Sequence, residues 1–127
     1  MSRQGAVEQG SAEEREKRAL LEQGIAVAVS IRHHRDLIAW ANEHGLFVRV
    51  DRATPWGNPF VLGKDGDRAT VIARYRHDHL PFRANLLARL GELRGKALGC
   101  WCAPQACHAD VLIQELERRG LHSEVVT

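Results

Sequence analysis

Three short apolar segments alternate with stretches of helical periodicity, and this alternation constrains the fold more than any other feature of the chain. The segments are residues 25–31 (IAVAVSI), 46–51 (LFVRVD) and 96–101 (KALGCW). Their lengths, and the β-branched residues of the first two, are typical of strands. Strands that alternate with helices favour an α/β fold. We therefore predict a small, mainly parallel sheet of three or more strands flanked by helices, with an N-terminal helical appendage.

Helix signals lie between and around these strands. Ser11 and Glu14 have the spacing of a capping box, which predicts a first helix over residues 12–23. Asp67 is placed to cap a helix that begins at Arg68 and ends at Pro81. Apolar periodicity predicts the remaining helices over residues 36–44, 83–93 and 107–119. We divide the chain into an N-terminal extension (1–24), a single α/β domain (25–120) and a C-terminal tail (121–127).

Length and charge narrow the class of protein. The chain has 127 residues, of which 44% are hydrophobic, enough for one domain with a core of its own. Lys and Arg number 18 against 16 Asp and Glu, and this net charge of +2 is too small to be typical of a protein that coats DNA. No stretch without Asp, Glu, Lys or Arg is long enough to span a membrane. No secretory signal opens the chain, so we expect a cytoplasmic protein.

All three cysteines lie within eight residues, and a histidine follows directly. They are Cys100, Cys102 and Cys107, followed by His108. Side chains alternate along a strand, so Cys100 and Cys102 should point to one side. The chain then returns with Cys107 and His108 at the start of a helix. The carboxyl end of a strand in an open α/β sheet is the usual place for a site.

Three interpretations of this cluster remain open. Cys100, Cys102, Cys107 and His108 have the composition of a Cys₃His zinc site, although their spacing is not that of a standard zinc finger. Alternatively, Cys107 is a catalytic thiol activated by the helix N-terminus, and His108 exchanges protons with it or with a substrate. The third interpretation is that the cysteines are small buried hydrophobic residues.

A second loop carries residues suited to ligand binding. Residues 52–60 read RATPWGNPF, and Arg52 follows a strand, where it could hold an anion. Trp56 offers a stacking surface, Gly57 a permissive backbone and Asn58 an amide that donates and accepts. Arg68 is a second candidate for the anionic group. The alternative is a tight hydrophobic turn whose Trp56 closes the core.

The longest motifs, residues 56–60 (WGNPF) and 100–112 (CWCAPQACHADVL), resemble a bacterial and phage family named "domain of unknown function 4326". The resemblance covers about residues 25–117, and its opening strand resembles residues 27–33, where the family usually shows an Asn near Ser30. That Asn is absent here, so no role for it carries over. The motif from Cys100 to His108 is also similar to the "domain of unknown function 488" proteins. Further matching positions are Gly66, Asp67, Arg68, Tyr75 and Leu98.

The resemblance implies that the two motifs belong to one site, but it implies no activity. Family members often occur on the genomes of phages and mobile elements. Our leading hypothesis is that the domain binds or processes a nucleotide or nucleic-acid component at this Cys/His/Trp/Arg site. The alternative is a metal-stapled, non-catalytic interaction module of phage or mobile-element systems. A weaker hypothesis is nucleic-acid binding by the basic cluster at residues 32–35.

Overall fold

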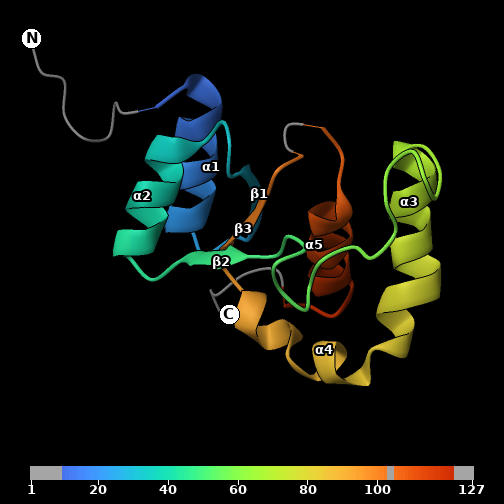
Figure 1. Ribbon diagram of the computed structural model, residues 1–127. Coiled ribbons are helices and arrows are strands. Elements are labelled where there is room, and N and C mark those ends of the chain that lie inside the picture. Colours follow the sequence, from blue (N-terminus) through green and yellow to red (C-terminus); the bar gives the residue numbers. More distant parts are fainter. Residues whose placement is uncertain (1–9, 103–104, 122–127) are drawn as a thin grey trace, which may run out of the picture.

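The computed structural model describes residues 10–102 and 105–121, and their strands form one small parallel sheet (Figure 1). The strands are β1 (Val27–Ser30), β2 (Phe47–Arg49) and β3 (Ala97–Cys100). Their order in the sheet is β1-β3-β2, and β3 pairs in parallel with both neighbours. The predicted α/β class and the parallel sheet are confirmed.

Helices cover both faces of the sheet. Figure 1 shows α1 (Ala12–Glu22) and α2 (Arg35–Glu43) on one side, and α5 (His108–Arg118) on the other. The helix α3 (Arg68–Arg74) lies beyond α5 and continues into a π-helical turn, Tyr75–His79. The remaining elements are the 3₁₀ turn Leu80–Phe82, the short helix α4 (Ala84–Ala88) and the 3₁₀ turn Leu90–Leu93.

The alternation of side chains along β1 and β3 gives each face of the sheet its own core. Val27, Val29 and Ala97 pack with Leu21 of α1 and residues of α2. Leu98, next to Ala97 along β3, belongs to the larger core with α5 and the π-helical turn. Neighbouring side chains on a strand point to opposite faces, so the two cores lie on the two sides of the sheet.

The connections after β1 and β3 leave the sheet toward opposite faces. β1 leads into α2, which belongs to the smaller core, and β3 leads into α5, which belongs to the larger one. Sites in open parallel sheets form at the carboxyl ends of the strands, so the end of the central strand β3 is an expected place for one. Cys100 is the last residue of β3 and therefore lies at this edge.

The N-terminal helix α1 begins as predicted and packs against the rest of the fold. Ser11 and Glu14 form the expected capping box. The buried Glu14 carboxylate also accepts a hydrogen bond from the backbone N–H of Leu37 in α2, at 3.0 Å. The same carboxylate therefore caps two helices, which fixes α1 against α2.

The expectation of one helix over residues 83–93 is wrong. The helix α4 ends at Ala88, and residues 90–93 form a 3₁₀ turn that contains Gly91. Glycine is a poor helix former, so the helical pattern of apolar residues did not suffice to continue the helix. Leu86, Leu90 and Leu93 nevertheless face the core, as their spacing predicts.

Within the described residues, no helix combines the length and the apolar character that crossing a membrane requires. Of the predicted C-terminal tail, residues 122–127 lie outside the described part of the chain, as do residues 103–104 of the predicted loop before α5.

Candidate functional site

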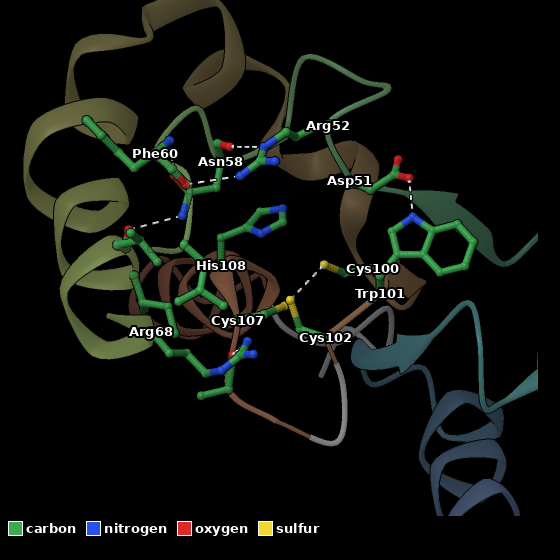
Figure 2. A pocket seen from close by; sticks show the side chains of 14 residues that line it. Asp51, Arg52, Asn58, Phe60, Arg68, Cys100, Trp101, Cys102, Cys107 and His108 are labelled. Atoms are coloured by element: carbon green, nitrogen blue, oxygen red, sulfur yellow. Dashed lines mark hydrogen bonds between the residues drawn. The ribbon is translucent and has the colours of Figure 1, made fainter. Parts of the chain in front are cut away.

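A pocket of about 270 Å³ opens where the carboxyl ends of β2 and β3 face the loop 52–60 and the helix α3 (Figure 2). The two motifs of the sequence, far apart along the chain, both contribute to its wall. The lining residues are Asp51, Arg52, Asn58, Phe60, Leu62, Arg68, Val71, Ile72, Cys100, Trp101, Cys102, Ala106, Cys107 and His108.

Three potential metal ligands converge in this wall. Cys100, Cys107 and His108 are buried, and their donor atoms all lie within 4.8 Å of one another. The Sγ of Cys102 lies 3.8 Å from that of Cys100, so the fourth predicted residue borders the group. Cys100, Cys107 and His108 form a group that could hold a metal ion.

The separation of the sulfurs fits a tetrahedral zinc site. With a Zn–S bond of about 2.3 Å and tetrahedral angles, two thiolate ligands of one zinc ion are about 3.8 Å apart. Cys100 and Cys102 show this separation. The Sγ of Cys107 lies within 4.8 Å of that of Cys100. The sulfurs of Cys100 and Cys102 therefore have the separation that two ligands of one zinc ion would show.

The start of α5 positions two of these ligands. Cys107 is the N-cap residue, and its Sγ accepts a hydrogen bond from the backbone N–H of Ala109 at 3.2 Å. The carboxylate of Asp110 accepts one from the backbone N–H of Cys107, at 3.0 Å. This reciprocal arrangement holds both the thiol and the following His108 at the edge of the sheet.

His108 has the surroundings of a ligand imidazole. Its Nε2 bonds to the backbone carbonyl of Val50, so the lone pair is left on Nδ1. Burial, above all, lowers the pKa of His108 and favours the neutral ring, which is the form that binds metals. The ring of Tyr75, in the π-helical turn, contacts that of His108 edge-on at 5.1 Å between centroids.

The three thiols differ in acidity. Hydrogen bonds with Cys100 and Cys107, together with the nearby Arg68, lower the pKa of Cys102. The pKa of Cys107 is raised, because the other two thiols hydrogen-bond to it and because it is buried. The sequence predicts the reactive thiol at Cys107, and Cys102, whose pKa is lowered, is the less buried of the two.

The predicted ligand-binding loop serves the fold more than the pocket. Trp56 is 3% exposed, belongs to the larger core and does not line the pocket. Its carbonyl accepts a hydrogen bond from the hydroxyl of Tyr75 at 2.8 Å. The backbone of Arg52 passes so close to Gly57 that a Cβ there would lie 2.5 Å from the Cα of Arg52. The alternative of a tight turn with a buried Trp56 therefore describes this loop.

Asn58 lines the pocket, but its side-chain amide already forms hydrogen bonds within the protein. Its Nδ2 donates to the carbonyl of Val71 and its Oδ1 accepts from the N–H of Phe60, both at 3.0 Å. Arg52 donates from Nε to the carbonyl of Asn58 at 2.9 Å. Arg68 donates to the carbonyl of Ala106 at 3.2 Å. The two arginines thus stabilise loops while placing positive charge in the pocket wall.

Sequence reasoning missed Trp101 and Asp51. Trp101 lines the pocket and is 49% exposed, and its indole N–H donates to the Asp51 carboxylate at 2.9 Å. In Figure 2, the indole lies beside the sulfur cluster with its N–H directed toward Asp51. The position of Trp101 in the sequence could have identified it as a site residue, since it directly follows a strand and stands between two cysteines.

The basic cluster at residues 32–35 is only partly available to a partner. His34 is 2% exposed; its Nδ1 accepts from the N–H of Ser30 at 2.8 Å, and its Nε2 lies 3.2 Å from the Glu13 carboxylate. The imidazole therefore connects β1 to α1. Arg32, His33 and Arg35 are exposed.

Comparison with known proteins confirms the resemblance seen in the motifs. The model of the family "domain of unknown function (DUF4326)" matches residues 29–118, and the chain belongs to this family. It is 36% identical over 75 residues to an uncharacterized 12.4 kDa protein from the nrdA-td intergenic region of Enterobacteria phage T4. That match covers 56% of this chain and 68% of the phage protein. No solved structure matches the chain.

Proposed function

We propose that this domain binds a small nucleotide-like molecule in a pocket whose floor is a zinc ion held by Cys100, Cys102, Cys107 and His108. The observation that carries the proposal is the convergence of these four side chains in the wall of a pocket that also contains Arg52 and Arg68. A group of three thiols and one imidazole is a common ligand set for zinc.

The charges around the cluster support a metal with thiolate ligands. Zinc with three thiolates and a neutral imidazole has a net charge of −1. Arg68 lines the same pocket and lowers the pKa of Cys102, so its guanidinium would compensate this charge. The N-terminus of α5 also favours negative charge at Cys107. The ion would join the end of β3 to α5 and thereby shape the pocket.

The remaining wall suits a molecule with a planar apolar part and an anionic part. Phe60, Leu62 and Trp101 supply apolar surface, and Arg52 and Arg68 supply positive charge. The negative charge of Asp51 is balanced by its ion pair with Arg49. Small-molecule pockets usually measure about 300–1,000 Å³, and this one lies just below that range at about 270 Å³. The pocket therefore fits one mononucleotide better than a larger cofactor.

Calorimetry with the zinc-loaded protein and a panel of nucleoside monophosphates tests the ligand. We expect at least one of them to bind, and Arg68→Gln to weaken its binding at least tenfold. Arg32→Gln removes the same charge from an exposed position outside the pocket and should leave affinity unchanged. If no nucleotide binds a folded, zinc-loaded protein, the ligand proposal is contradicted.

The metal is tested separately, by titration with cobalt(II), which gives absorption bands when thiolates bind it. We expect saturation at one ion per chain and loss of the bands in Cys107→Ser and His108→Ala. The exposed His77 provides a matched control, since His77→Ala should bind cobalt(II) normally. A protein that binds zinc but no nucleotide would favour the metal-stapled interaction module. A protein that binds no metal would instead favour catalysis by a thiol, with Cys107 and His108 as the residues predicted from sequence.

A further inference from the structure

Trp101 presents a large aromatic surface at the pocket, where the residue is 49% exposed. The described residues contain four exposed large hydrophobic side chains, and two of them, Leu62 and Trp101, line this pocket. The other tryptophans have different surroundings. Trp56 lies in the core, and Trp40 packs against His44 and Arg18. Trp101 is therefore the tryptophan whose ring is available to a ligand in the pocket.

A buried carboxylate fixes the orientation of this ring. Asp51 is 5% exposed and accepts a hydrogen bond from the indole N–H at 2.9 Å. Arg49 pairs with the same carboxylate, with its Nε 3.2 Å from Oδ1. Burial on its own would raise the pKa of Asp51, but hydrogen bonds from Arg49 and Trp101 lower it, so the carboxylate stays ionised and keeps its role as acceptor.

A ring held in this way loses little freedom when a ligand stacks on it. The hydrogen bond to Asp51 uses the polar edge of the indole, and the indole faces offer apolar, polarisable surface. Stacking on an aromatic side chain accepts any base, because every base has a π-face. Leu62 and Phe60 add further apolar surface around the same opening.

We propose that Trp101 is the stacking platform of the pocket and that the ligand is a free mononucleotide whose base lies against the indole. This inference rests on the proposed function, since it assigns the base-binding surface of the same pocket. Asp51 and Arg49 are positioning residues, which act through the orientation of the indole. The base-binding tryptophan expected from sequence was Trp56, whose burial removes it from contact with a ligand.

The test compares AMP with ribose 5-phosphate, which has the anionic group without the base. Loss of a stacking contact of 1–3 kcal/mol corresponds to about a 5- to 160-fold loss of affinity. We expect Trp101→Ala to weaken the binding of AMP by this factor and to leave the affinity for ribose 5-phosphate unchanged. Trp101→Phe should retain AMP binding to within about threefold. Asp51→Asn should give a smaller loss than Trp101→Ala, because the ring remains but is held less firmly.

Tryptophan fluorescence gives a readout that a structural role of Trp101 would not produce. AMP should quench the emission of the wild type and of Trp40→Phe, whereas Trp101→Phe should bind AMP without that quenching. Equal AMP affinity in wild type and Trp101→Ala would overturn the stacking platform while leaving the proposed function intact. If the wild type binds ribose 5-phosphate as tightly as AMP, the base contributes no affinity and the stacking platform is likewise overturned. A decanucleotide that binds much more tightly than AMP would overturn the assignment of a free nucleotide.

Discussion

The side chain of Asn58 joins the loop 56–60 to α3 by donating a hydrogen bond to the carbonyl of Val71, and it braces the loop itself by accepting one from the N–H of Phe60. The residue is buried, so neither bond is easily replaced by water. Tyr75 holds the same loop through the carbonyl of Trp56. At the scale of single residues, the conspicuous side chains of this motif therefore support the wall of the pocket.

Replacing Asn58 with Ala leaves the Val71 carbonyl and the Phe60 N–H without these partners. Because unpaired buried groups cost about 1–3 kcal/mol, we expect the free energy of unfolding to fall by about that amount. Urea denaturation measures it. Asn85→Ala, at an exposed position, is the matched control and should change little. Equal stability of the two variants would show that the Asn58 hydrogen bonds contribute nothing measurable.

Gly57 is required by the close passage of its own loop. A Cβ at this position would lie 2.5 Å from the Cα of Arg52 and 2.8 Å from the carbonyl oxygen of Asp51, and both of these are backbone atoms. We therefore expect Gly57→Ala to lower the melting temperature and to weaken ligand binding, since Asp51 and Arg52 line the pocket. Gly91→Ala is the control, because a Cβ at Gly91 would meet nothing within 4 Å. A Gly57→Ala protein as stable as the control would contradict the close contact of the loop with itself.

The residue types in the sequence predicted which chemical groups the site contains. They did not predict which side chains face the pocket. The cysteines and His108 were identified as candidate ligands, and three of these four residues meet in the structure as a possible metal-binding group. The choice between Trp56 and Trp101 could not be made from the pattern. Whether a tryptophan is 3% or 49% exposed depends on what packs against it from elsewhere in the chain.

At the scale of elements, the strands were the most predictable part of the fold. Each lies inside its predicted segment, because a short apolar run between turn residues has few alternatives. The π-helical turn at Tyr75–His79 was not foreseen. It continues α3 with helical residues, and no local sequence signal distinguishes it from an α-helix. Its tertiary contacts, including those of Tyr75 with Trp56 and His108, are the features that single out this turn.

The contact between α1 and α2 gives a prediction about elements. The Glu14 carboxylate accepts from the N–H of Ser11 at 2.9 Å and from that of Leu37 at 3.0 Å. Its loss in Glu14→Ala uncaps both helices, so we expect a fall of about 1–3 kcal/mol in the free energy of unfolding and faster hydrogen exchange at Leu37. The exposed Glu16 provides the control substitution Glu16→Ala. Unchanged exchange at Leu37 would contradict the shared cap.

At the scale of the whole molecule, the sheet brings distant segments of the chain together. β2 and β3 are neighbours, so the residues that follow β2 meet those that follow β3 at one edge. The bond between His108 and the carbonyl of Val50 joins the start of α5 to the end of β2 directly. The cluster of thiols lies at the centre of this junction, and for that reason the proposed zinc ion matters both to the fold and to the pocket.

X-ray absorption at the zinc edge, on protein purified without a histidine tag, reads the ligand set directly. With one zinc ion per chain, the account predicts three sulfur ligands at about 2.3 Å and one nitrogen ligand at about 2.0–2.1 Å. Nucleotide binding should leave this shell unchanged, because all four ligands come from the protein. Protein that takes up no zinc, or zinc surrounded only by nitrogen and oxygen, would contradict the assignment of Cys100, Cys102, Cys107 and His108.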